Sequence, residues 1–204
     1  MKQLIARKKG MTHIIDEDGT MTAVTALQVD PCVIVQIKTA EKDGYDAIQL
    51  GAGKKRNPNK PEQGHNKGLG KFAILREVKT DDISAFKIGQ KIGLDIFESG
   101  QKVDVTSRSI GKGFAGTVKR YSFNRGPTTH GHDHHRQVGS IGSGTDPGRV
   151  IKGKRMPGRM GNKMVTQLGL KIARIVNEHN LVFVKGSVPG KKNSWVMIRK
   201  SIKA

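Results

Sequence analysis

Residues 31–39, PCVIVQIKT, form a short run of β-branched and apolar side chains that is typical of a β-strand. Segments rich in Asp, Glu, Asn and Gly, such as 16–19 and 177–180, predict turns between such runs. Short helices are expected only near 81–83 and 114–121. The pattern predicts a mainly β protein, built as a small barrel or sandwich. Further strand-like runs lie at 24–29, 45–50, 72–78, 103–106, 165–176, 181–185 and 195–199.

The charge of the chain indicates the kind of partner that it binds. Its 204 residues include 37 lysines and arginines against 17 acidic residues, which gives a net charge of +20. A chain with this excess repels itself unless it binds a polyanion. Nucleic acid is therefore the first expectation, and an anionic membrane surface is the second.

Three features predict a cytoplasmic protein without a membrane span. The longest apolar runs, such as 32–35 and 181–184, are far shorter than the roughly 18 residues that cross a bilayer. Residues 1–11 contain only Leu4–Ile5–Ala6 between charged residues, so a secretory signal is not expected. Cys32 is the single cysteine and can form no internal disulfide, which fits a reducing compartment.

The positive charge is concentrated in the middle of the chain. Residues 1–107 contain 17 basic and 14 acidic side chains, residues 108–163 contain 12 and 2, and residues 164–204 contain 8 and 1. The middle region also holds 12 of the 26 glycines and shows no hydrophobic periodicity, so we expect it not to fold alone. Residues 53–71, with six basic and one acidic side chain, are expected to form a second basic surface arm.

Two motifs in this middle region are similar to nucleotide-binding loops, and each lacks a required part. Gly111, Gly113 and Gly116 have the G-x-G-x-x-G spacing, but the second parallel strand and the acidic residue of a dinucleotide fold do not follow. Residues 148–154 have Walker A spacing, but Arg155 stands where a magnesium-binding hydroxyl is needed. The same glycines and lysines suit an RNA phosphate, which needs only exposed amides and cations.

A histidine cluster, HGHDHH at 130–135, is the third motif that suggests an enzyme. Its spacing is similar to the H-x-H-x-D-H ligand set of zinc hydrolases, but Asp133 precedes His134, and no distant ligand motif accompanies it. The alternative is that these imidazoles stack on bases and donate to phosphates. Elsewhere, Cys32 is expected to be an inert buried thiol, and Trp195 to lie in the core or at its rim.

A further set of motifs extends along the whole chain. Together these segments resemble the bacterial form of the family of the third protein of the large ribosomal subunit. The motifs are KKGMT at 8–12, PCVIVQIKT at 31–39, EKDGYDAIQLG at 41–51, NKP at 59–61, GH at 64–65, GKGFAGTVKR at 111–120, RGP at 125–127, HG at 130–131, GSIG at 139–142, DPGRV at 146–150, GKRMPGRMG at 153–161 and NLVFVKG at 180–186.

The resemblance implies both a fold and a function. The implied fold is a six-stranded barrel of the translation-protein type with an inserted small α+β domain and a long basic irregular extension. The implied function is that of a structural constituent of the large ribosomal subunit, which binds 23S rRNA directly, nucleates subunit assembly and extends a basic loop towards the peptidyl transferase centre. Neighbouring ribosomal proteins are implied as partners. No catalysis, cofactor, metal site, membrane partner or small-molecule substrate is implied.

Basic and polar residues at the motif positions are the expected rRNA contacts. Arginines can bind phosphates in a bidentate manner or stack on bases, and lysines act as point charges. Glycines let the backbone pass close to RNA helices. The expected contacts are Lys8, Lys9, Lys54, Lys55, Arg56, Lys60, His65, Lys67, Lys112, Lys119, Arg120, Arg125, His130, His135, Arg136, Ser140, Arg149, Lys152, Lys154, Arg155, Arg159, Asn162 and Lys163.

The chain departs from the family pattern within the extension. His132, His134, Gln137 and Val138 stand where relatives more often carry other polar, basic or proline residues. In some bacteria a glutamine at the tip is methylated. The corresponding position here is Thr145, so this modification is not expected.

Overall fold

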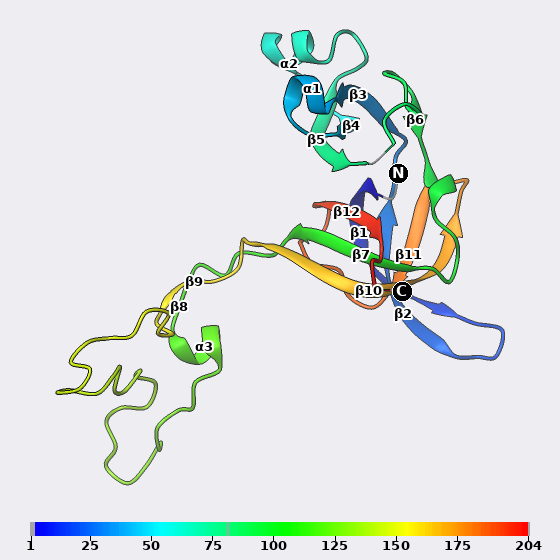
Figure 1. Cartoon of the computed structure of the whole chain (residues 1–204). Helices are drawn as coiled ribbons and strands as arrows, with labels where there is room; N and C mark the ends of the chain where they lie inside the picture. The colour runs from blue at the N-terminus through cyan, green and yellow to red at the C-terminus, as the bar shows by residue number, and fades with distance from the viewer. Residues whose placement is uncertain (1–2, 81, 204) are drawn as a thin grey trace. The chain divides into compact units, whose positions relative to one another are not determined.

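The computed structural model describes residues 3–80 and 82–203, and Figure 1 shows their strands and helices. The prediction of a mainly β protein is confirmed, because strands far outnumber short helices along the chain. Every strand pair in the described residues is antiparallel. The chain divides into two compact units, one formed by Met1–Ser109 with Met164–Ala204 and the other by Ile110–Lys163.

Six strands of the first unit close into a barrel in the order β1-β12-β7-β10-β11-β2. Closure pairs both sides of each strand, so the barrel presents no open edge to another chain. The strands are β1 (Gln3–Ile15), β2 (Met21–Gln28), β7 (Lys102–Arg108), β10 (Met164–Val176), β11 (Leu181–Lys185) and β12 (Trp195–Lys200).

Strand β1 is the longest element that the sequence pattern did not predict. Leu4, Ile5 and Ala6 are buried in the barrel, but the basic run that follows hides the pattern. The pairing register with β2 also shifts between Lys8 and Gly10, which marks a bulge. A bulge interrupts the alternation of inward and outward side chains on which the prediction of a strand depends.

A second sheet of the same unit has the order β5-β4-β3-β6. Its strands are β3 (Cys32–Lys38), β4 (Ala47–Lys54), β5 (Phe72–Lys79) and β6 (Lys91–Ile92). Three short helices connect the strands of this unit: α1 (Ala40–Asp43), α2 (Lys60–His65) and the 3-10 helix η1 (Leu94–Ile96). The helix expected near 81–83 is wrong in its described part, because residues 82–83 are not helical, while Asp81 lies outside the described residues.

Helix α2 lies within the segment 53–71, which was expected to be a basic surface arm. A capping box at Asn59 and Glu62 stabilises the start of this helix. Lys55 reinforces the box because its Nζ lies 2.5 Å from Glu62 Oε1. Proline at the second helical position, Pro61, also favours a helix start. Local capping therefore gives this arm regular structure that its composition did not indicate.

One hydrophobic core joins the barrel to the second sheet. Each of its central side chains is at most 1% exposed, which makes the first unit a single packed body. Core members from the barrel and from the second sheet include Leu4, Ile5, Leu27, Ile34, Ile48, Leu50, Val103, Val105, Ile172, Val182 and Ile198.

A buried carboxylate fixes the irregular part of the barrel. Asp104 on β7 is 2% exposed, and it accepts hydrogen bonds from the backbone N–H of Gly169 (3.0 Å) and from the Arg199 side chain (3.2 Å). Gly169 lies where the register of β10 against β7 shifts, and its φ of 66° favours glycine. Burial raises the pKa of Asp104, but the bonds from Gly169, Ser201 and Arg199 outweigh it and hold the pKa below its ordinary value.

The second unit, Ile110–Lys163, follows β7 and precedes β10, so it is inserted between two paired strands of the barrel. It contains a two-stranded pairing of β8 (Phe114–Ala115) with β9 (Gly158–Arg159) and one short helix, α3 (Thr117–Tyr121). The helix expected within 114–121 is therefore confirmed in its last five residues. All residues of this unit are described, and only Ala115 and Thr117 among them are buried.

Candidate nucleic-acid interface

The second unit is held together by a short stem at its base. The backbone N–H of Lys112 donates to Met160 O, and the N–H of Met160 donates to Gly113 O, both at 2.9 Å. Gly161 is required here, because its φ is 72° and an added Cβ would collide with Ile110 O. These contacts close the chain on itself at the point where β8 and β9 pair.

Arg120 braces the stem from α3. Its Nη1 donates to Met156 O at 2.7 Å and leaves no room for a side chain at Gly158, whose ideal Cβ would lie 2.6 Å from that nitrogen. The guanidinium also lies 4.9 Å from the centre of the Tyr121 ring. Arg120 was expected to contact rRNA, and in the structure its guanidinium is already bonded within the second unit.

The chain between the stem strands has turns and bends but no regular structure after α3 ends at Tyr121. The histidine cluster lies in a small closed loop, where Gly126 N–H donates to His135 O at 3.1 Å and His135 Nδ1 donates to Pro127 O at 2.9 Å. His132 and His134 contact each other edge-on, with ring centres 6.1 Å apart. The histidine side chains of this cluster therefore contact one another within the loop.

The cations of this unit other than Arg120 are exposed. Its 11 lysines and arginines are accompanied by only two acidic residues, Asp133 and Asp146. Nearby apolar side chains are exposed as well, including Phe114 at 81% and Ile151 at 63%. A surface that combines a large excess of cations with exposed apolar groups is typical of a region that a nucleic acid covers.

Most of the sequence-predicted contacts lie at the surface. Within the second unit, all of them are exposed except Arg120 and Asn162, which are half-buried. In the first unit, Lys8 and Lys55 are half-buried, and the other predicted contacts are exposed. One of these, His65, is bonded within the chain, since its Nε2 lies 2.6 Å from Gln49 Oε1. The exposed contacts of the first unit are Lys9, Lys54, Arg56, Lys60, His65 and Lys67.

Two predicted contacts have structural partners within the chain. Lys8 Nζ donates to Val188 O at 2.6 Å and to Gly190 O at 2.9 Å, and burial lowers its pKa. Lys55 pairs with Glu62, and that hydrogen bond lowers the pKa of the Glu62 carboxyl. Both lysines therefore hold loops of the first unit in place.

Tyr121 was not among the contacts predicted from the sequence, yet two arginines lie close to its ring. Arg155, in the irregular segment before β9, lies 5.7 Å from its ring centre, and Arg120 lies beside it in sequence. The sequence did contain an indication of this contact, because an aromatic residue directly follows the basic pair Lys119 and Arg120. Aromatic rings interleaved with cations are suited to stacking on RNA bases.

The nucleotide-binding alternatives find no structural support. Gly111, Gly113 and Gly116 precede a helix of only five residues, and their strand pairs antiparallel with β9. Residues 148–154, the Walker-like run, contain neither strand nor helix. Among the described residues, no group of three or more His, Cys, Asp or Glu could hold a metal ion.

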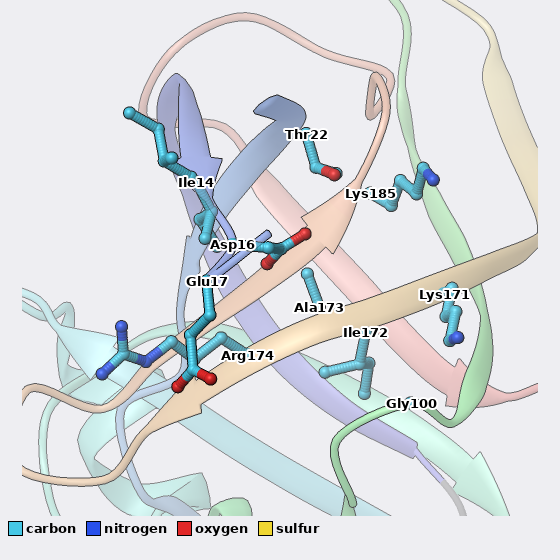
Figure 2. Close-up of a pocket in the computed structure, with 11 residues that line it drawn as sticks. Ile14, Asp16, Glu17, Thr22, Gly100, Lys171, Ile172, Ala173, Arg174 and Lys185 are labelled. Atoms are coloured by element: carbon cyan, nitrogen blue, oxygen red, sulfur yellow. The ribbon is translucent and has the colours of Figure 1, made fainter. Parts of the chain in front are cut away.

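A cavity in the barrel wall is lined mainly by charged and aliphatic side chains. It has a volume of about 440 Å³ and lies between the β1–β2 hairpin and strands β10 and β11 (Figure 2). Asp16 and Glu17 lie at the hairpin end, while Lys171, Arg174 and Lys185 lie on the facing strands. Its described lining includes no histidine or cysteine, and its two acidic residues face three cations.

The sequence of this chain is similar to those of known proteins of the large ribosomal subunit. The ribosomal protein L3 family profile matches residues 78–180. A large ribosomal subunit protein uL3 from Herpetosiphon aurantiacus is 50% identical over 205 residues, which covers 98% of this chain and 97% of that protein. The uL3 protein of Syntrophobacter fumaroxidans is 46% identical over 100% of this chain and 99% of its own length.

The chain therefore belongs to the ribosomal protein L3 family. It is a ribosomal protein and not an enzyme, as members of this family are structural proteins. None of the helices in residues 3–80 and 82–203 is long and apolar enough to cross a membrane.

Proposed function

We propose that this chain binds 23S rRNA directly, helps to nucleate assembly of the large subunit, and carries residues 110–163 as an extension towards the peptidyl transferase centre. The observation that supports this most is the charge of that unit: 11 cations, two acids and almost no buried side chains. In this proposal, the closed six-stranded ring is a translation-protein-type barrel, and the second sheet with its helices is the inserted α+β domain. Neighbouring ribosomal proteins are further partners.

The mechanism is counterion replacement. RNA helices repel each other unless cations lie between them, and each lysine or arginine that binds a phosphate releases condensed counterions. The many glycines with positive φ in the second unit, such as Gly131, Gly139 and Gly153, let the backbone turn tightly between helices. Because few of its side chains are buried, most of the order of this unit comes from the RNA that it binds.

The test is the salt dependence of binding to a 23S rRNA fragment. Neutralising 6 to 10 phosphates predicts a loss of affinity of about 10³ to 10⁵ between roughly 50 and 200 mM salt. Replacing Arg149, Lys152, Lys154 and Arg155 together with alanine should flatten the log–log slope by about 0.7 to 0.9 for each phosphate that is no longer neutralised.

The matched control replaces four exposed lysines of the first unit, Lys42, Lys79, Lys87 and Lys102, with alanine. Lys38 is unsuitable for this control because it is bonded to Glu77 at 2.8 Å and to Tyr45 at 2.7 Å. Equal slope changes in the two variants would contradict a localised extension. Equal affinity for duplex DNA and rRNA would instead indicate a general nucleic-acid compactor.

A further inference from the structure

A second candidate RNA site lies within the first unit. It is a cavity of about 590 Å³ between the barrel strands β1 and β12 and the second sheet. Trp195 and Phe72 line it together with Arg7, Lys54 and Lys91. Neither aromatic ring is fully buried, since both residues are half-exposed.

The backbone of β4 is shaped to receive these two rings. An added Cβ at Gly51 would lie 2.6 Å from Phe72 Cγ, so that ring rests directly on the glycine. Gly53 has a φ of 68°, and a side chain there would collide with the edge of Trp195. The two glycines thus fix both rings at the cavity and leave part of each ring accessible.

Cations surround the aromatic surface. Arg7 pairs with Trp195 across β1 and β12, and its guanidinium lies 5.2 Å from the indole ring centre. Lys54 and Lys91 are exposed at the same cavity. Asp30 is the acidic residue in the lining, and it already accepts a hydrogen bond from Gln28 at 2.8 Å. The cavity therefore combines flat π surfaces with a net positive rim.

We propose that this cavity binds one unpaired nucleotide of RNA, with its base against Trp195 and its phosphate beside Lys54 or Lys91. A nucleotide carries a flat π face and a negative phosphate in one unit, and both match the lining. A protein segment would have to bring an acidic and an aromatic side chain together to do the same. This site rests on the proposed rRNA binding and adds to it a specific base-binding position.

Trp195 reports directly on the site because it is the only tryptophan of the chain. A single-stranded RNA octamer of mixed sequence is titrated against the full-length protein while indole fluorescence is recorded. An octamer without bases but with the same phosphates is the matched ligand. We expect base-dependent quenching with the first octamer and none with the second. Equal responses to the two octamers would overturn base recognition.

Variants separate stacking from charge. Trp195→Leu should weaken octamer binding by about 5- to 150-fold, the range found for loss of one base–aromatic stack. Trp195→Phe should retain most of the affinity, and Arg7→Gln should reduce the quenching. Lys185→Gln, an exposed cation of the barrel that lies at the other cavity, is the control and should leave the quenching unchanged. An unchanged affinity in folded Trp195→Leu would contradict the proposal.

A crosslinking experiment distinguishes this proposal from rRNA binding in general. A photoreactive phenylalanine analogue replaces Val33, which lines the cavity, and the protein is incorporated into large subunits. A crosslink to an rRNA nucleotide supports the site, whereas a crosslink to another protein overturns it. RNA binding without base-dependent quenching would reject this cavity and leave the proposed function standing.

Discussion

The two units of the chain differ in how far their positive charges are paired with acidic residues. The first unit has 26 basic and 15 acidic residues, and several of its cations are satisfied internally, as in the pairs Lys55–Glu62 and Arg199–Asp104. The second unit has 11 basic residues against two acidic ones and buries almost nothing. An apolar core, together with acidic residues that pair with several of the cations, gives a body that folds by itself. Unbalanced charge without a core gives a segment whose order depends on an anionic partner.

The largest expected difference between the units is in their resistance to trypsin. Cleavage of a core strand requires opening that approaches global unfolding, about 5–15 kcal/mol, whereas an exposed turn opens at almost no cost. In the free protein, cuts after Arg136, Arg149 and Lys152 should therefore be at least about 10³-fold faster than cuts after Lys185. Mass spectrometry of timed digests measures this ratio.

The segment 53–71 provides a second comparison in the same digestion experiment. Its helix α2 and the Lys55–Glu62 pair should make it slower to cleave than residues 122–155, although both are basic. Glu62→Ala should abolish this difference by removing the capping box. Similar initial rates in all three regions would show that the contrast between the two units is wrong.

The carboxylate of Asp104 should contribute measurably to the stability of the first unit. Asp104→Ala leaves Arg199 and the Gly169 N–H without their acceptor. Because the Arg199 side chain is 38% exposed and water can solvate it, the loss should be about 1–3 kcal/mol. Urea unfolding measures the change. The matched control is Asp146→Ala in the second unit, an exposed acid that should alter the free energy of unfolding by less than about 0.5 kcal/mol.

The pH dependence of stability tests the same residue. Because the folded-state pKa of Asp104 is lowered, its contribution is present above the ordinary aspartate pKa and is lost as the pH falls through the folded value. The wild type should therefore lose more stability than Asp104→Asn between about pH 5 and pH 2. Parallel pH profiles would show that the ionised form of Asp104 does not stabilise the barrel.

Thiol reactivity should differ between the units by about 10²-fold. Burial raises the pKa of the Cys32 thiol to about 11, so little thiolate exists at pH 8 and the side chain is also covered. Ser140→Cys in the second unit provides an exposed thiol for comparison. Reaction with a disulfide reagent should be fast at position 140 and should reach Cys32 only after denaturant is added. Rapid reaction of native Cys32 would contradict a closed core.

Most of this contrast could be predicted from the sequence, because charge and hydrophobic runs are local properties. The strands around 31–39 and 181–185 were predicted, whereas β1 was not, since its bulge at Lys8–Gly10 conceals the period of two. The roles of Lys8 and Arg120 could not be predicted either. Each of these two side chains donates to a backbone carbonyl that is far away in sequence. The charge of a residue alone does not show whether it stabilises the fold or binds RNA.

The smallest expected effect is on the stability of the first unit when residues 122–155 are deleted. Joining Tyr121 to Met156 through a short Gly–Ser linker keeps the stem strands β8 and β9 and removes only exposed or half-buried residues. The free energy of unfolding should change by less than about 1 kcal/mol, since the segment contributes nothing to the core. The deletion should nevertheless remove most of the salt dependence of rRNA binding. As an internal control, Asp104→Ala should cost the same amount with and without the deletion, because the sites are independent. Loss of a cooperative transition on deletion would mean that the first unit needs residues 122–155 in order to fold.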